Sequence, residues 1–84
     1  MGYYIIYGWD DCPFCNSAKE LLQDNGLHHM YVSLDHDDGL LEHFKKYYDW
    51  PTVPIIVEQH MHKNASTLIG GYTDLCKHLE ENNT

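Results

Sequence analysis

The segment YYIIYGWDDCPFCNSAKELL, residues 3–22, sets two cysteines two residues apart between an apolar run and a helical pattern. Residues 3–7 are β-branched and aromatic without alternation, which predicts a strand covered on both faces. After Pro13, which suits a first helical turn, apolar residues recur at helical spacing until Asn25-Gly26 supplies a stop: Phe14, Ala18, Leu21 and Leu22. We therefore expect a strand and then a helix, with Cys12 at the N-terminal edge of the helix.

The rest of the chain predicts five further elements. Residues 29–34 form a second strand, and two strands joined by a helix of this length favour a right-handed parallel βαβ unit. A second helix is expected to be capped by Asp37 or Asp38 and ended by Trp50-Pro51, with one apolar stripe made of Leu40, Leu41, Phe44, Tyr47 and Tyr48.

Residues 55–58 and 67–69 are predicted strands joined by a polar connection, and Gly70-Gly71 breaks the chain after them. A last helix, capped by Thr73 or Asp74, would bury Tyr72, Leu75, Cys76 and Leu79. The order βαβαββα, without repeats or a linker, predicts a single α/β domain over residues 1–84.

Composition and charge exclude several classes of partner and of protein. The 84 residues include 13 acidic and 5 basic side chains, a net charge of -8, so nucleic acid and anionic membrane surfaces should repel the protein. No apolar run approaches the ~20 residues of a membrane helix, and no export signal is recognised. Three cysteines are too few for a stapled secreted scaffold. We expect a soluble cytoplasmic protein that acts as a monomer.

The C-x-x-C pair admits three interpretations. Between a strand and a helix of a cytosolic protein it is typical of a redox pair, since free N–H groups at the helix start stabilise a thiolate. A zinc site would need two more ligands, which His60 and His62 could supply from one face of a strand; Cys76 and His78 point in different directions on a helix. Two inert packed thiols are the third interpretation.

Three motifs, CPFC at residues 12–15, TVP at 52–54 and GGYTDL at 70–75, together resemble the glutaredoxin family over nearly the whole chain. The resemblance implies a thioredoxin-like fold, a four-stranded mixed sheet flanked by three helices. It also implies a glutathione-dependent thiol-disulfide oxidoreductase that serves cell redox homeostasis by electron transport through a reversible disulfide bond. Glutathione would be a co-substrate, and no metal is expected.

The resemblance implies that Cys12 is the nucleophile and Cys15 the resolving thiol. Pro54 would be a cis-proline, although a trans edge-strand proline is the alternative. Asp74 would hold the glutathione ammonium group, although a plain turn and helix cap would use the same residues. The implied glutathione contacts are Phe14, Thr52, Val53, Pro54, Gly71, Tyr72, Thr73 and Asp74.

The chain departs from the family pattern in three ways. Trp9 stands where glutaredoxins usually carry a lysine, Phe14 stands where they favour tyrosine, and there is no arginine. Asp10 and Asp11 bring negative charge to the thiolate. Implied partners are disulfide-containing proteins, with ribonucleotide reductase as one family substrate. Two alternatives remain: a glutaredoxin-like electron donor reduced by thioredoxin reductase, and a glutathione-ligated [2Fe-2S] cluster carrier, against which Pro13 argues by stiffening the loop.

Overall fold

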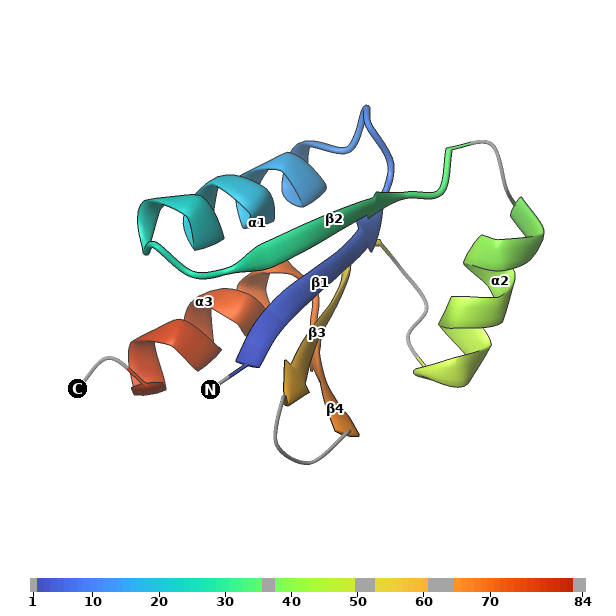
Figure 1. Cartoon of the computed structure of the whole chain (residues 1–84). Coiled ribbons are helices and arrows are strands. Elements are labelled where there is room, and N and C mark those ends of the chain that lie inside the picture. The colour runs from blue at the N-terminus through green and yellow to red at the C-terminus, as the bar shows by residue number, and fades with distance from the viewer. Residues whose placement is uncertain (1, 36–37, 50–52, 61–64, 83–84) are drawn as a thin grey trace.

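The structure is a computed structural model that describes residues 2–35, 38–49, 53–60 and 65–82. Its seven elements follow the predicted order βαβαββα (Figure 1). They are β1 (Gly2–Gly8), α1 (Pro13–Asp24), β2 (His29–Ser33), α2 (Asp38–Tyr47), β3 (Ile55–His60), β4 (Ala65–Gly70) and α3 (Tyr72–Asn82).

The strands form one mixed sheet in the order β2-β1-β3-β4. Strand β1 pairs in parallel with β2 and antiparallel with β3, so that Ile6 lies between Tyr31 on one side and Ile56 on the other. Helices α1 and α3 lie on one face of the sheet, and α2 lies on the opposite side (Figure 1). Because β1 is central, the loop that leaves its C-terminal end is anchored on both sides.

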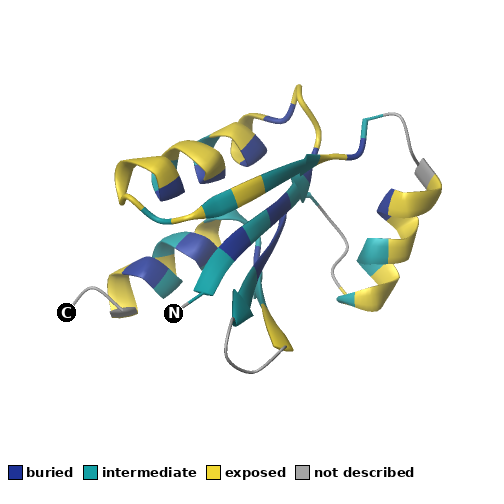
Figure 2. Cartoon of the chain, in the orientation of Figure 1, coloured by how far each residue is buried: buried dark blue, intermediate teal, exposed yellow. Residues whose placement is uncertain are grey.

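The core lies between the sheet and the α1–α3 layer. Strand β1 alternates along its length between buried residues facing these helices and half-buried residues facing α2 (Figure 2). The predicted burial of this strand on both faces is therefore confirmed for one face only. The buried cluster comprises Tyr4, Ile6, Ala18, Leu22, Ile56, Leu75 and Leu79.

Helix α2 covers its side of the sheet incompletely. Its main described contact with β1 is the stacked pair Tyr7 and Phe44, whose ring centroids lie 4.2 Å apart. Leu41 is buried, but Leu40 is exposed and 69% of Tyr47 is accessible. The predicted apolar stripe is therefore only partly buried, and Leu40 and Tyr47 are exposed positions of it. The proposed cap at Asp37 and the end at Trp50-Pro51 lie outside the described residues.

Strands β3 and β4 are longer than predicted, because main-chain pairing continues through polar residues. Gln59 pairs with Ser66 and His60 with Ala65, beyond the apolar runs that defined the predicted strands. Conversely, β2 ends one residue early at Ser33, although the Leu34 N–H still donates to the Gly8 carbonyl oxygen at 2.8 Å. Across the described ranges, no helix is both long and apolar enough to cross a membrane.

Candidate active site

Cys12 is the N-cap residue of α1. Its backbone is extended, with φ -103° and ψ 110°, and its sulfur accepts a hydrogen bond from the Cys15 N–H at 3.2 Å. Its carbonyl oxygen accepts the first intrahelical bond from the Asn16 N–H at 3.0 Å. Pro13 occupies the first turn, where its missing N–H costs nothing. The Cys12 sulfur thus takes the place of a capping oxygen, at a helix end that favours negative charge.

Cys15 lies one turn further into the helix and is completely buried. Its side chain packs against the main chain of Gly8, where an added Cβ would lie 2.5 Å from the Cys15 sulfur, so this strand position admits only glycine. Burial raises the pKa of the Cys15 thiol to about 12, and a hydrogen bond with Cys12 adds to the shift. The two free cysteines are therefore chemically unequal.

A hollow lies between the start of α1, the start of α3 and the residues before β3. The Val53–Pro54 peptide bond is cis, as the resemblance implies. Phe14 is 62% exposed, and its ring lies 6.2 Å from that of Tyr72 across the two helix starts. The hollow is lined by Phe14, Val53, Pro54, Gly71, Tyr72, Thr73 and Asp74. These are the predicted glutathione contacts except Thr52, which lies outside the described residues.

The start of α3 differs from the predicted cap. Gly71 is the N-cap, because its carbonyl oxygen accepts from the Leu75 N–H at 3.0 Å, and its own N–H donates to an Asp74 oxygen at 3.0 Å. Asp74 therefore caps from within the first turn, as the acid of a capping box does. Gly70 has φ +121°, and a Cβ there would lie 2.6 Å from the Asp74 carboxylate. The prediction of Thr73 or Asp74 as the N-cap residue is wrong by two or three positions.

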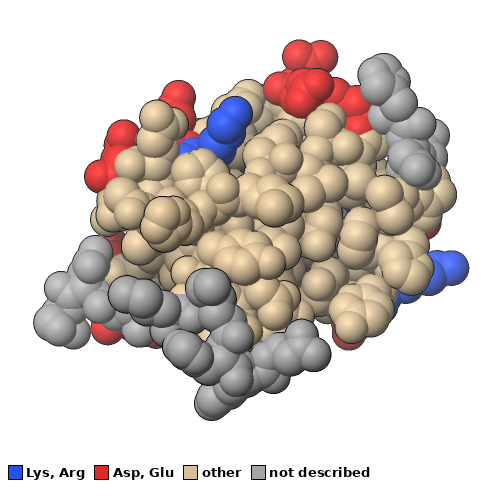
Figure 3. Space-filling view, in the orientation of Figure 1, with Lys and Arg blue, Asp and Glu red and all other residues tan. Residues whose placement is uncertain are grey.

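Negative charge gathers over the β1–α1 connection (Figure 3). The Asp10 N–H donates to both carboxylate oxygens of Asp35, at 3.0 and 3.2 Å. The side-chain hydrogen bond with Asp35, and then its charge, raises the pKa of the Asp10 carboxyl; Asp11 contributes further. Asp35 is not among the site residues predicted from the sequence. Its position after β2, beside the end of the parallel strand β1, was the available signal.

Tyr31 is a second residue that the sequence analysis missed. Its hydroxyl donates to the Trp9 carbonyl oxygen and lies close to Gly8, at 3.3 Å from the position of an added Cβ. Burial, and then the neighbouring Cys15, raises the pKa of the Tyr31 hydroxyl. The parallel pairing of β1 and β2 was predicted, but only the register places Tyr31 beside Ile6 on the face that carries Cys15.

The remaining candidates are Cys76, which is hydrogen-bonded to Tyr72 of the hollow, and the proposed zinc ligands. Cys76 is half-buried on α3, and the His60 ring is paired with the Thr67 hydroxyl at 2.8 Å. His62, the other half of the proposed zinc pair, lies outside the described residues. Within the described ranges, no three His, Cys, Asp or Glu side chains converge as metal ligands would.

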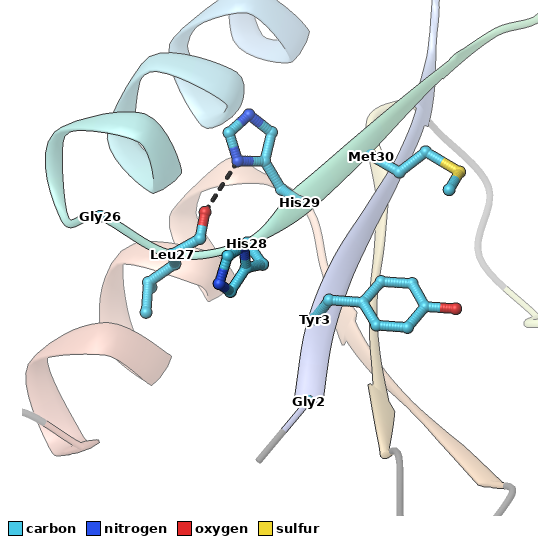
Figure 4. Close-up of a pocket in the computed structure, with 7 residues that line it drawn as sticks. All are labelled: Gly2, Tyr3, Gly26, Leu27, His28, His29 and Met30. Carbon is cyan, nitrogen blue, oxygen red and sulfur yellow. Dashed lines mark hydrogen bonds between the residues drawn. The ribbon is translucent and has the colours of Figure 1, made fainter.

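A second hollow lies at the opposite end of β1 (Figure 4). It is lined by Gly2, Tyr3, Gly26, Leu27, His28, His29 and Met30, and the His29 ring is bonded there to the Leu27 carbonyl oxygen at 2.9 Å. Cys15 packs against Gly8, at the other end of β1, so the cysteine chemistry belongs to the other end of the sheet.

The buried thiol gives the first testable prediction. With a pKa of about 12, roughly one Cys15 side chain in 10,000 is ionised at pH 8, so iodoacetamide should leave Cys15 of the folded, reduced protein unmodified. Mass spectrometry of peptides measures the modification. The matched control is the same protein in denaturant, where Cys15 should react readily. Modification of folded Cys15 at the unfolded rate would contradict the assigned burial.

Comparisons with known proteins agree with this geometry. The glutaredoxin family model matches residues 4–61. A buckwheat glutaredoxin–glutathione complex is similar in structure, with a TM-score of 0.78 and 17% sequence identity over 96% of this chain and 71% of the buckwheat chain. A wheat glutaredoxin has a TM-score of 0.77 and 20% identity over 95% of this chain and 71% of its own. An Archaeoglobus fulgidus glutaredoxin has a TM-score of 0.66 and 23% identity over 96% of this chain and 85% of its own. No curated protein sequence matches significantly. The chain belongs to the glutaredoxin family and has its thioredoxin-like fold, the scaffold of thiol-disulfide oxidoreductases.

Proposed function

We propose that this protein is a dithiol glutaredoxin that uses glutathione to reduce protein disulfides and glutathione mixed disulfides. The observation that carries the proposal is the pair of unequal cysteines. The Cys12 sulfur caps a helix and accepts an N–H, whereas the Cys15 sulfur is buried one turn away. A thiolate-stabilising position beside a protected thiol suits a nucleophile followed by a resolving group.

The proposed reaction begins when the Cys12 thiolate attacks a substrate disulfide. A bond forms between Cys12 and one substrate sulfur, and the other substrate sulfur leaves as a thiolate. With a protein disulfide, the Cys15 sulfur then attacks the Cys12 sulfur and releases the substrate sulfur that was bonded to Cys12. With a glutathione mixed disulfide, a second glutathione attacks the glutathionylated Cys12 instead, and Cys15 is not required.

The hollow beside α3 is proposed to hold the glutathione moiety. The main chain of Val53, next to the cis Pro54, would pair with the extended tripeptide as a short added strand. The N–H groups of Tyr72 and Thr73 at the helix start suit the γ-glutamyl carboxylate. Asp74 has one oxygen engaged with Gly71 and a second oxygen for the ammonium group. A glutathione complex of a structurally similar buckwheat protein supports this assignment.

The surroundings of Cys12 favour a protein partner as the second substrate. Trp9 and Phe14 are both exposed, and they are aromatic side chains of the kind that anchor protein interfaces. We further propose that the protein acts as a cytoplasmic monomer on disulfide-containing proteins, with ribonucleotide reductase as one candidate. Three cysteines are too few for a disulfide-stapled secreted scaffold, which favours a reducing compartment.

A coupled assay with glutathione, glutathione reductase, NADPH and a small glutathione mixed disulfide tests the proposal. Cys12→Ser should reduce turnover to the uncatalysed background, because no nucleophile remains. Cys15→Ser should retain mixed-disulfide turnover and lose the reduction of protein disulfides, because only the latter needs a resolving thiol.

The same assay separates the alternatives. Inactivity of the wild type with glutathione, together with activity restored by thioredoxin reductase, would contradict glutathione dependence and favour the electron-donor alternative. Anaerobic purification with iron, sulfide and glutathione tests the cluster carrier, for which a stable brown protein would be the positive result.

The departure at Trp9 gives a separate prediction. Trp9→Lys restores the cation that the family usually carries, and attraction to a glutathione carboxylate should lower KM for the mixed disulfide by about two- to fivefold. Trp9→Gln is the matched control, because it removes the indole without adding charge. Raising the salt concentration should shrink the gain. Equal KM values for Trp9→Lys and Trp9→Gln would mean that glutathione does not approach this position.

A further inference from the structure

The buried Cys15 sulfur faces two hydrogen-bond donors that the reaction described so far does not use. The Tyr31 hydroxyl lies beside the thiol at Gly8, and hydrogen bonding from the Trp9 main chain and from Tyr31 lowers the pKa of the thiol against the larger, opposing effect of burial. The Tyr31 oxygen and the Cys15 sulfur both lie close to Gly8. A Cβ added to Gly8 would be 3.3 Å from the Tyr31 oxygen and 2.5 Å from the Cys15 sulfur. One small gap, opened by a glycine, thus holds both groups.

The Tyr31 hydroxyl has two partners within reach. It donates to the Trp9 carbonyl oxygen, while its oxygen lies beside the Cys15 thiol. Rotation about the C–O bond turns the same hydrogen from the carbonyl toward the sulfur without moving the ring. A hydroxyl of this kind accepts from a neutral thiol and donates to a thiolate, so it can follow the change in charge.

We propose that the Tyr31 hydroxyl, together with the Trp9 N–H, stabilises the Cys15 thiolate as it attacks the mixed disulfide on Cys12, which makes Tyr31 a catalytic residue of the resolving step. This inference rests on the proposed dithiol function and assigns a part of it. Hydrogen-bond donors placed beside a buried atom that becomes charged are the arrangement by which proteins stabilise developing charge.

The step balances as an ordinary thiol exchange. The Cys15 sulfur forms a bond to the Cys12 sulfur, and the bond between Cys12 and the substrate sulfur breaks. The substrate sulfur leaves with the bonding electron pair and takes up, through solvent, the proton that Cys15 gives up. Cys12 and Cys15 are oxidised to a disulfide, and the substrate is reduced by two electrons.

The charged groups around this gap come from α1 with its N-cap and from the β1–α1 connection. After the larger effect of burial, Cys12 also raises the pKa of the Cys15 thiol. The pKa of the Tyr31 hydroxyl is raised most by burial, less by Cys15 and Cys12, and least by Asp10 in the connection. Lys19 of α1 lies over the Tyr31 ring, 5.3 Å from its centroid. Phenylalanine at position 31 would keep the ring, its packing and this cation contact, and would remove only the donor.

Reaction with the chromogenic disulfide DTNB tests the proposal, in proteins that all carry Cys76→Ser to remove the third thiol. Attack by Cys12 releases the first nitrothiobenzoate, and attack by Cys15 releases the second, which Cys15→Ser should abolish. In Tyr31→Phe the second phase should slow about tenfold, the effect of one hydrogen bond to a charged group, while the first phase is unchanged. The pH at which the second phase of Tyr31→Phe reaches half of its maximal rate should rise by about one unit.

Tyr47→Phe is the matched control, because it removes an exposed hydroxyl on α2. A second variant carries 3,5-difluorotyrosine at position 31, whose more acidic hydroxyl should speed the second phase. The proposal is overturned if Tyr31→Phe and Tyr47→Phe have equal second phases, if Tyr31→Phe slows both phases equally, or if fluorination has no effect. These phases need no glutathione, so a failed coupled assay with an intact DTNB result would overturn glutathione dependence alone.

Discussion

The active site depends on one close contact, the packing of the Cys15 side chain against the main chain of Gly8. This contact seats the first turn of α1 on the end of β1, and no side chain fits between them. Because β1 is paired on both sides, the helix start is held at a fixed place, with the buried Cys12 as the N-cap. The capping bond to the Cys12 sulfur follows from this placement.

The two thiols differ in their surroundings, although they are the same functional group. Both cysteines carry the same thiol, but 7% of Cys12 and none of Cys15 is accessible to solvent. The outer sulfur accepts the Cys15 N–H at the helix N-terminus, whereas desolvation raises the pKa of the inner thiol. In the proposed mechanism, the inner thiol reacts only after a mixed disulfide has formed at Cys12, and Trp9 and Tyr31 are proposed to stabilise its thiolate in that step.

Periodicity and motif spacing predicted the element order and the place of Cys12, because these follow from local pattern, whereas the residues that line the hollow were implied by the family resemblance. Periodicity and spacing did not predict what depends on tertiary register. Tyr31 is one half-buried residue of a short strand, and only its pairing opposite Ile6 brings it to Cys15. Likewise, the apolar residues of α2 indicated a helix, but not that Tyr47 would lie outside the contact with the sheet. The cap of α3 was displaced because Asp74 bonds backward to Gly71.

The most direct test of the account is to trap the first covalent intermediate. Cys15→Ser protein is exposed to one equivalent of glutathione disulfide, and the modified peptide is identified by mass spectrometry. The account predicts a single glutathione on Cys12 and none on Cys76, because only Cys12 combines a helix N-cap with a neighbouring binding hollow. Adducts on Cys76, or none at any cysteine, would contradict the assignment of Cys12 as the nucleophile.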